Sequence, residues 1–598
     1  MKQFFKMTLA TIFGIAIFLL ITGFFLVISL LGMLASDSAS TKVKENSVFV
    51  IQMTGSVEER AAEGSPIDGL VGMGSDSSIG LDDLISSIRK AKDEDNIKGI
   101  YLEGGSMTFD WPASAQQLRD ALADFKKSGK WIVAYADDYG QMNYYVASVA
   151  DNIFLNGEGS IDLKGFGGKS EYYKGFLDKL GVRVQATKVG KYKSAVESLT
   201  RSDMSDYDRE QRLAYMNGIW NHWLKQIGEG RKVSPEQLNQ LVSDSIVRLA
   251  DTKDYVKAKL IDKVLFPEEI KAEIKNRLKL GKDDDINQLT LSDMKNVKSK
   301  TTREGDKIAV YYAYGSIVDD ESFSPLDYGS HQIVGKTVAE DLRKLADDDD
   351  VKAVVFRVNS GGGSAVASEQ IRHAVKLVKA KKPVVVSMSG AAASGGYWIS
   401  SPANYIFAEP TSITGSIGIF AMIPNVSVLM NDKLGISYDG AKTNKYSDYE
   451  QNLIYAKDNG QELEFLQHHV DRGYNDFLNI VSEGRGLKHE QVDSIAQGRV
   501  WLATDAVGIK LVDKLGSLDD AVKKAAELAK VKEYYTSPYP NEGSWLDQFL
   551  PKENKGSYLD SELRNMLGDL YQPLMEVRMT LKDGSRLQAK MLEDLRSK

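Results

Sequence analysis

The longest apolar segment of the chain lies near its N-terminus, where residues 7 to 35 contain no charged side chain. A helix rises about 1.5 Å per residue, so one of this length exceeds the roughly 30 Å apolar core of a bilayer. The pattern predicts a membrane anchor, because the apolar core of a cleaved signal peptide is shorter, about 7 to 15 residues. Lys2 and Lys6 precede the segment. They favour a cytoplasmic N-terminus, with residues 37 onward on the far side of the membrane.

In the rest of the chain, short Val-rich stretches alternate with segments of helical periodicity. The stretch VKAVVFRV at 351 to 358 is followed by the loop NSGGGS, and then by a segment that places Ile371, Val375 and Val378 on one helical face. A second Val-rich stretch, KPVVVSMS, follows at 382 to 389. Continuous apolar strands separated by helices are typical of a mostly parallel sheet covered on both faces. The predicted fold class is therefore α/β.

The two halves of the chain resemble each other. SVFVIQMTGSV at 47 to 57 resembles KIAVYYAYGSI at 307 to 317, and YYVASVADNIFLNGEGSI at 144 to 161 resembles YWISSPANYIFAEPTSI at 397 to 413. DKLGV at 178 to 182 likewise resembles DKLGI at 432 to 436. Because the spacing stays at about 250 to 260 residues, the sequence predicts two copies of one domain, joined by a polar connection at 281 to 306.

These patterns divide the chain into four parts. We expect a cytoplasmic stub and anchor at 1–36, an N-terminal domain at 37–300, a C-terminal domain at 301–530 and a helical extension at 531–598. The extension begins with YYTSPYP, whose two prolines predict a loop. Further on, four apolar side chains share one helical face and predict a helix that packs on the assembly or binds a partner: Leu563, Met566, Leu567 and Leu570.

Composition removes several classes of function. The net charge is −8, with 75 basic and 83 acidic residues mixed along the chain, so there is no basic stripe of the kind that nucleic-acid binding requires. The chain has no cysteine, which excludes metal-thiolate sites and cysteine nucleophiles and is compatible with an oxidising compartment. No G-x-x-x-x-G-K-[ST] phosphate-binding pattern is present.

One serine stands in an unusual setting. Ser394 lies within GAAASGGYWISS at 390 to 401, just after a predicted strand and among residues too small to fill a core. Small neighbours let a substrate backbone approach the hydroxyl. The Gly395 N–H lies beside it and the SGGGS turn at 360 to 364 is a second source of backbone donors, as acyl transfer requires. Ser394 is therefore a candidate nucleophile.

The general base is less obvious from the sequence. None of the six histidines follows a strand in a convincing loop, and surface or core roles account for them. A lysine can act as the base if burial lowers its pKa, although by default a lysine is a solvated surface residue. Aligning the repeats pairs Lys193 with Ser447 and Ser394 with Gln141, so each half has what the other lacks. This pairing makes Lys193 a candidate base, while a triad with one of the histidines stays open.

Several motifs carry a family resemblance. GKYKSAVE at 190 to 197, VNSGGGSAVASEQI at 358 to 371 and MSGAAASGGYWISSPANYIFAEPTSITGSIGIF at 388 to 420 closely resemble the signal peptide peptidase A family of the long, duplicated type. This family, also called protease IV or peptidase family S49, comprises membrane-anchored Ser/Lys proteases related in fold to the Clp protease and to crotonases. The resemblance covers nearly all of residues 45 to 530.

The resemblance implies a role for individual residues. Ser394 corresponds to the nucleophile, Lys193 to the general base and Ser416 to the serine that orients the lysine amine. Gly395, Gly362 and Gly363 correspond to the oxyanion hole. The chain departs from the family at position 361, where glycine replaces the usual proline. Losing the fixed φ of proline makes this loop more flexible in the unfolded chain but removes no backbone donor.

The resemblance also implies a biological setting. It points to hydrolysis of remnant signal peptides, and of other unfolded chains, by a homotetramer anchored in the bacterial inner membrane by its N-terminal helix. The catalytic domains would lie on the periplasmic or outer side, with neither metal nor organic cofactor. Two other classes stay open at this point: a crotonase-like acyl-CoA enzyme and a non-catalytic membrane scaffold. A cytoplasmic cofactor suits an external domain poorly, and a scaffold has no use for the predicted serine and lysine residues.

Overall fold

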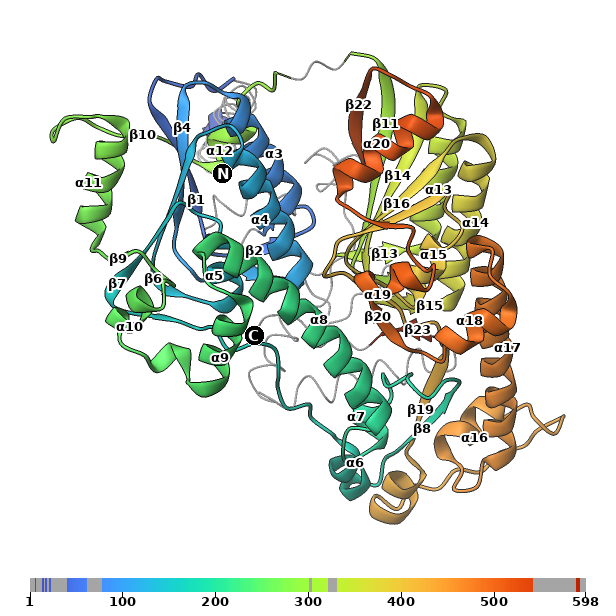
Figure 1. Ribbon diagram of the computed structural model, residues 1–598. Helices are drawn as coiled ribbons and strands as arrows, with labels where there is room; N and C mark the ends of the chain where they lie inside the picture. Colours follow the sequence, from blue (N-terminus) through green and yellow to red (C-terminus); the bar gives the residue numbers. More distant parts are fainter. Residues whose placement is uncertain are drawn as a thin grey trace.

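The computed structural model describes residues 40–61, 78–300, 304–320, 331–540 and 588–591, together with isolated residues among the first 22. The predicted anchor at 7 to 35 and the predicted apolar helix at 563 to 570 lie outside the described residues, apart from those isolated positions. Among the described residues, no helix has the length and apolar character needed to cross a membrane. Figure 1 shows two lobes, each built around its own sheet.

The N-terminal lobe contains a parallel six-stranded sheet in the order β10-β1-β4-β6-β7-β9. Its strands are β1 (Ser47–Gln52), β4 (Ile97–Glu103), β6 (Trp131–Tyr139), β7 (Asn152–Ile161), β9 (Lys263–Val264) and β10 (Asn287–Leu289). The helices of the N-terminal half of the chain are α3 (Leu81–Asp93), α4 (Pro112–Lys126), α5 (Gln141–Ala147), α6 (Lys174–Leu180), α7 (Glu197–Thr200), α8 (Asp206–Arg231), α9 (Pro235–Asp244), η1 (Val247–Leu249), α10 (Thr252–Lys257), α11 (Pro267–Leu278) and α12 (Leu291–Lys295). Of these, α6 and α7 lie beside β8 (Arg183–Lys188) and β19 (Phe420–Asn425), as Figure 1 shows. A small parallel sheet joins β2 (Ser56–Glu58), β3 (Ile79–Gly80) and β5 (Thr108–Phe109).

The C-terminal lobe has an eight-stranded sheet along β20-β18-β16-β14-β11-β22, with β17 and β21 branching from β16. Its strands are β11 (Asp306–Tyr314), β14 (Val351–Ser360), β16 (Val384–Ala393), β17 (Tyr405–Ala408), β18 (Ile413–Gly415), β20 (Val500–Leu502), β21 (Lys514–Leu515) and β22 (Tyr534–Tyr539). Its helices are α13 (Gly335–Asp347), α14 (Ala365–Lys381), α15 (Gly395–Ser400), η2 (Val428–Lys433), α16 (Tyr449–Tyr455), α17 (Gly460–Arg485), α18 (His489–Ile495), α19 (Ala503–Gly508) and α20 (Leu518–Ala529).

The duplication seen in the sequence is repeated in the strand order. The series β10-β1-β4-β6-β7-β9 of the first sheet corresponds to β22-β11-β14-β16-β17-β21 of the second. Both sheets are covered on both faces, as the Val-rich strands predict. In the first, α11 packs on one face and α3 and α4 on the other; in the second, α20 packs on one face and α13 and α14 on the other. The predicted helical face of Ile371, Val375 and Val378 is fully buried in α14.

Two segments expected to be irregular contain edge strands. The polar connection at 281 to 306 includes β10 and α12, and the proline-containing stretch expected as a loop forms β22, with Pro538 opposite Val310. Proline has no backbone N–H to donate to a neighbouring strand, so it is disfavoured in central strands. An edge strand tolerates it, because one side of that strand has no neighbour. β10 and β22 are short or polar, and each lies beside the first strand of its half, β1 or β11. Their place in the sheet is therefore decided by that neighbouring strand and not by an apolar pattern of their own.

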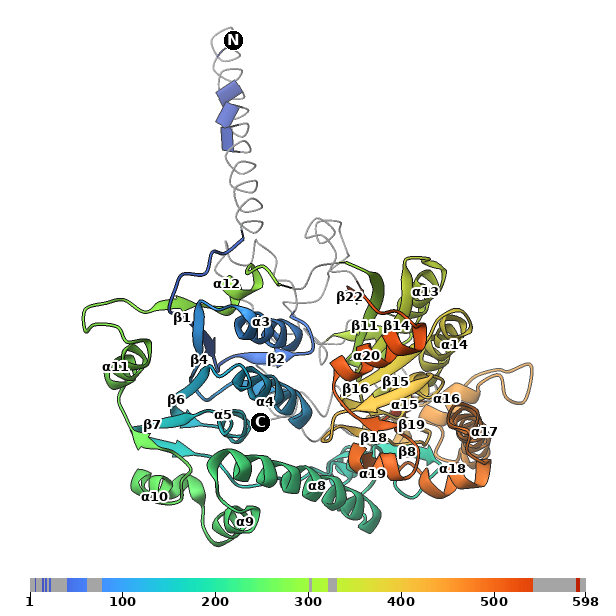
Figure 2. The ribbon, with the colours of Figure 1, turned by 45° about the horizontal axis from the view of Figure 1, so that its top comes forward.

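The two lobes are joined by a strand exchange, in which a strand from the N-terminal half of the chain pairs with a strand of the C-terminal half. β8 (Arg183–Lys188), which lies between β7 and β9 in the N-terminal half of the chain, pairs antiparallel with β19 (Phe420–Asn425) of the C-terminal half. These strands belong to a third sheet, β13-β12-β15-β23-β19-β8, which also contains β12 (Ser316–Val318), β13 (Gln332–Val334), β15 (Gly362–Ser364) and β23 (Gln588–Lys590). Figure 2 shows α8 running along the base from one lobe to the other. This exchange carries the loop after β8 into the C-terminal lobe.

Candidate active site

Ser394 lies at the junction between β16 and α15. It is the residue before the first turn of α15, with φ 54° and ψ −115°, a conformation that residues with a side chain rarely adopt. Its N–H donates to the Gly415 carbonyl over 2.8 Å and its side chain is fully buried. Two residues further on, Gly396 packs against the backbone of Ser360, and a Cβ at position 396 would lie 2.5 Å from the Ser360 carbonyl oxygen. The small residues seen in the sequence therefore let this turn pack directly on the glycine loop.

Lys193 reaches the same place from the other half of the chain. It lies in the turn that follows β8, and the neighbouring Tyr192 N–H donates to the Gln497 carbonyl over 2.9 Å. Gly498 packs so closely on Lys193 that a Cβ at position 498 would lie 2.7 Å from both the Lys193 nitrogen and its Cβ. The side chain of Lys193 is only 1% exposed. The default expectation of a solvated lysine is therefore wrong at this position.

The lysine amine contacts both candidate serines. Lys193 Nζ lies 2.8 Å from Ser394 Oγ, 3.1 Å from Ser416 Oγ and 3.1 Å from the Ser416 carbonyl oxygen. Burial lowers the pKa of Lys193 to about 7. A neutral amine has two N–H groups and one lone pair, so the two N–H groups can donate to Ser416 while the lone pair accepts the Ser394 hydroxyl proton. This arrangement is able to deprotonate a serine near neutral pH.

The glycine loop lies beside the serine. Gly362 has φ 102°, a conformation that favours glycine, and its N–H donates to Ser360 Oγ over 3.1 Å. Of the three predicted oxyanion donors, Gly362 thus has its N–H engaged within the loop, while Gly363 belongs to β15 and Gly395 begins α15. The backbone of Gly395 is close to this loop, because a Cβ on it would lie 3.1 Å from Gly362 Cα.

A buried charge pair supports the start of this loop and was not found from the sequence. Arg357 Nε donates to Glu59 Oε1 over 2.5 Å, and both side chains are almost fully buried. Asn359 Nδ2 donates to the same carboxylate over 3.2 Å, and the Asn359 side-chain oxygen accepts from the Ala391 N–H over 3.1 Å. The loop that lacks the family's proline is therefore held by side chains from both halves. A lone glutamate and arginine 298 residues apart carry no signal in the sequence.

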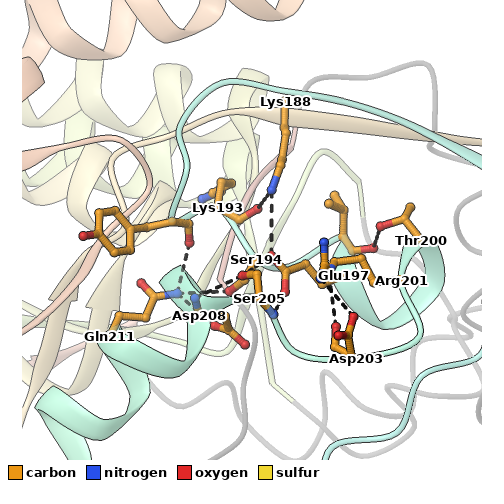
Figure 3. Close-up of polar contacts among 12 residues, drawn as sticks. Lys188, Lys193, Ser194, Glu197, Thr200, Arg201, Asp203, Ser205, Asp208 and Gln211 are labelled. Atoms are coloured by element: carbon orange, nitrogen blue, oxygen red, sulfur yellow. Dashed lines mark hydrogen bonds and ion pairs between the residues drawn. The ribbon is translucent and has the colours of Figure 1, made fainter.

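A second group of polar residues holds the lysine segment, and Figure 3 shows its contacts. Gln211 on α8 donates from Nε2 to the Tyr192 carbonyl over 3.0 Å and to Ser194 Oγ over 3.1 Å. Lys188 Nζ donates to the Lys193 carbonyl over 3.1 Å and lies 4.0 Å from Glu197. The residues on either side of Lys193 are thus fixed, although neither Gln211 nor Lys188 belongs to a recognisable motif.

The alternative bases and ligands do not gather at this site. Within the described part of the chain, none of the six histidines forms a hydrogen bond to Ser394 or Lys193: His222, His331, His373, His468, His469 and His489. Burial lowers the pKa of His222 to about 4. Among the described residues, no three His, Asp or Glu side chains cluster in a way that could hold a metal ion. The candidate groups that the structure brings together here are Ser394, Lys193 and Ser416.

A small cavity is lined in part by residues of the site. Its volume is about 20 Å³ and its lining includes Lys193, Ser416 and Gln211. A cavity needs roughly 10 to 15 Å³ of such volume to hold one water molecule. The cavity is therefore large enough for a single water molecule.

Comparison with known proteins places this site in a family. The model of peptidase family S49 matches residues 124–281 and 376–532, one match in each half and together more than half of the chain. The chain belongs to peptidase family S49. The two matches agree with the two repeats of sequence and structure, and each half contributes one of the two candidate catalytic side chains to this S49 peptidase.

Individual relatives agree with this assignment. The S49 peptidase is similar to Protease 4 of Salmonella typhi, 38% identical over 522 residues that cover 85% of this chain and 82% of the relative. Protease 4 of Haemophilus influenzae is 37% identical over 465 residues, 75% of this chain and 73% of the relative. A protein of Enterococcus faecium named "Putative signal peptide peptidase SppA" is 30% identical over 258 residues, 42% of this chain and 74% of the relative. The chain is a serine protease by family and by these relatives.

Proposed function

We propose that this S49 peptidase cleaves peptide bonds with Ser394 as the nucleophile and Lys193 as the general base. The observation that carries the proposal is the 2.8 Å distance between Lys193 Nζ and Ser394 Oγ inside a fully buried site. Ser416 orients the amine through its hydroxyl and its carbonyl oxygen. Gly395 and Gly363 supply backbone N–H groups to the oxyanion, with Gly362 shaping the turn between them.

The mechanism follows from these positions. Lys193 accepts the Ser394 proton as Oγ attacks the substrate carbonyl, and the backbone N–H groups stabilise the tetrahedral oxyanion. Lys193 then protonates the leaving amine, which yields an acyl-enzyme on Ser394. A water gives its proton to Lys193 and attacks the acyl carbon; as the bond to Ser394 Oγ breaks, Lys193 returns that proton to Oγ, which restores the serine and releases the product carboxylate. Neither a metal nor an organic cofactor takes part in any of these steps.

The substrates in this proposal are cleaved signal peptides and other unfolded chains. The name of the Enterococcus faecium relative supports a signal peptide as substrate. The predicted apolar anchor at 7 to 35 supports a position at the bacterial inner membrane, with the catalytic lobes on the outer side, close to such peptides. A homotetramer, and the Clp protease-like or crotonase-like character of each repeat, are further predictions from the family resemblance.

The test uses the full chain purified in detergent. We expect it to hydrolyse a labelled peptide with a hydrophobic signal-peptide sequence. An acyl-CoA thioester and an enoyl-CoA, the substrates expected of a crotonase-like enzyme, should remain unchanged. Mass spectrometry of the products identifies peptide-bond cleavage. Turnover of the acyl-CoA compound alone would favour a crotonase-like enzyme, and inactivity on both compounds would favour a scaffold.

The pH dependence of hydrolysis should report the lysine. Only neutral Lys193 can accept the serine proton, and burial lowers its pKa to about 7. We therefore expect kcat/KM for the labelled peptide to rise with pH, with a midpoint near 7, and to level off above it. A profile that falls with increasing pH across this range would mean that the protonated form of the titrating group is the active one, and would contradict the assignment.

Replacing Ser416 should weaken catalysis without abolishing it. Ser416→Ala removes one acceptor of the Lys193 amine and leaves the carbonyl acceptor in place. A hydrogen bond to a group that becomes charged contributes about 1.5 to 3 kcal/mol, so kcat should fall roughly 10- to 150-fold. The same variant should lower the midpoint of the pH profile, because the charged amine loses a partner. An unchanged midpoint with reduced kcat would show that Ser416 acts on something other than the lysine.

A further inference from the structure

The strand that leads to the nucleophile is irregular shortly before its end. The register between β14 and β16 shifts there, because Val358 lies opposite Met388 but Ser360 lies opposite Ala392. Three residues of β16 therefore face a single residue of β14, Asn359. Such a bulge interrupts the ladder of backbone hydrogen bonds and redirects the strand that follows it, and bulges recur beside active sites.

This bulge, residues 389–391, lies where β16 changes its other neighbour. Residues 385–388 pair with β17, and residues 391–393 pair with β18. Ser394 follows directly, and Gly395 begins α15. The conformation of the bulge therefore determines where the strand places the nucleophile and the backbone N–H next to it.

Asn359 holds the bulge with its side chain. The side-chain oxygen accepts from the Ala391 N–H over 3.1 Å, and Nδ2 donates to Glu59 Oε2 over 3.2 Å. The backbone carbonyl of Asn359 accepts from the Gly315 N–H over 3.0 Å, and the residue is only 6% exposed. An amide side chain carries both donor and acceptor atoms, so it can bridge a backbone N–H and a carboxylate. A leucine of similar size can form neither hydrogen bond.

The N-terminal half of the chain holds the rest of the bulge. Ser389 Oγ donates to Glu59 Oε2 over 2.7 Å. Gly390 packs against the ring of Trp111, where a Cβ at position 390 would lie 2.1 Å from the ring atom Cγ. Each residue of the bulge therefore has a defined contact, two of them with the N-terminal half and the third with Asn359.

Asn359 also precedes the glycine loop, which carries the other backbone donor. Gly363 lies four residues after Asn359, and Gly395 lies four residues after Ala391. The two N–H groups of the proposed oxyanion site thus belong to different segments, and the hydrogen bond between Asn359 and Ala391 joins those segments. Donors have to lie about 2.7 to 3.1 Å from the oxyanion, so a small shift between the segments moves one donor out of reach.

From these contacts we infer that Asn359 is a positioning residue of the reaction. It fixes the glycine loop against the strand end that carries Ser394, and so sets the spacing of the two oxyanion donors. The inference rests on the proposed function and adds to it a side chain that acts through the backbone rather than on the substrate. Its replacement should slow the chemical step more than it weakens substrate binding, because the donors matter most when charge develops on the carbonyl oxygen.

Asn359→Leu tests the inference, with the full chain purified in detergent and assayed at pH 8. Leucine fills a similar volume and removes the hydrogen bonds to Ala391 and Glu59. A displacement of about 1 Å in an active site can cost about 100-fold in rate, so kcat for the labelled peptide should fall roughly 10- to 100-fold. KM should stay within about twofold of the wild-type value, since the donors contribute mainly to the transition state.

A second readout is the inhibition constant Ki of a peptide aldehyde with the sequence of the acyl part of the labelled peptide. Ser394 Oγ adds to the aldehyde carbon, its proton passes to Lys193, and the former carbonyl oxygen takes the negative charge beside the backbone donors. Ki does not depend on how much of the protein is folded, so a purely structural defect would leave it unchanged. In Asn359→Leu it should rise by about the factor by which kcat falls.

Asn404→Leu is the matched control. Asn404 Oδ1 accepts from the Val384 N–H over 2.8 Å, so this variant also removes a side-chain hydrogen bond to β16, but at the end of the strand away from Ser394. Both kcat and Ki of Asn404→Leu should stay close to the wild-type values.

The outcomes separate the inference from the proposed function. A lower kcat in Asn359→Leu without a higher Ki would mean that less of the protein is folded, and unchanged values of both would mean that packing alone sets the spacing of the donors. Either result would overturn the inference and leave the proposed function intact. A wild-type protein that neither hydrolyses the labelled peptide nor binds the aldehyde would overturn both.

Discussion

Replacing Lys193 with methionine is expected to lower kcat for peptide hydrolysis by about 10²- to 10⁴-fold, the usual contribution of a positioned general base. Methionine has a similar length and no basic atom, and a buried apolar side chain has no charge to desolvate, so the variant should fold as well as the wild type. The loss therefore reports the lost proton acceptor rather than a lost structure. Initial rates at pH 8 with saturating labelled peptide measure it, with circular dichroism to confirm folding.

Lys191→Met is the matched control for this experiment. Lys191 lies two residues away, is exposed and stacks over the rings of Tyr192 and Tyr207 instead of entering the site. Its replacement should leave kcat close to the wild-type value. If Lys193→Met retained most of its activity, the proton acceptor would have to be another group, and the histidines would have to be reconsidered although none of them bonds to Ser394 in the described part of the chain.

Breaking the buried ion pair should give the largest loss of stability. Arg357→Met leaves the Glu59 carboxylate buried without its cation, which typically costs about 3 to 5 kcal/mol of unfolding free energy. The double variant Glu59→Gln/Arg357→Met removes both charges and should lose less than Arg357→Met alone. Equilibrium unfolding in urea, followed by tryptophan fluorescence, measures the change in unfolding free energy for the transition in which the C-terminal sheet unfolds.

The control for the ion pair is Arg343→Met. Arg343 is exposed on α13, and an exposed substitution away from caps and buried networks changes stability by about 0.5 kcal/mol or less. A double variant that is less stable than Arg357→Met would mean that hydrogen bonds of the glutamate, rather than its unpaired charge, dominate the cost. It would also show that Glu59 supports Asn359 and the glycine loop without the arginine.

Local patterns in the sequence were sufficient for the fold class and for proposing Ser394 as a candidate nucleophile. Val-rich runs and helical periodicity depend on residues close together in the chain, so they predict the parallel sheets and the buried face of α14 directly. The repeat could be read for the same reason, because two copies of one local pattern resemble each other wherever they lie in space. Ser394 was found because small residues beside a strand end are themselves a local signal.

The edge strands could not be found in this way. β10 and β22 have little apolar periodicity, and each is held in place by the first strand of its sheet. β23 comes from a stretch with no strand pattern and is fixed by β15 and β19 on either side. The neighbouring strands determine where such segments pair, because the hydrogen bonds between strands are made by backbone groups that every residue type except proline provides in full.

By itself, the sequence of this protein determined the α/β class, the duplication and the types of residue that could perform acyl transfer. Only the tertiary structure decided that Lys193 meets Ser394, 201 residues away, that burial lowers the pKa of the lysine, and that the C-terminal segment lies beside both. Periodicity and propensity act over a few residues, whereas proximity and desolvation depend on every element packed around a site. The pairing of β8 with β19 contributes to that packing and brings Lys193, whose pKa is lowered to about 7, into the C-terminal lobe.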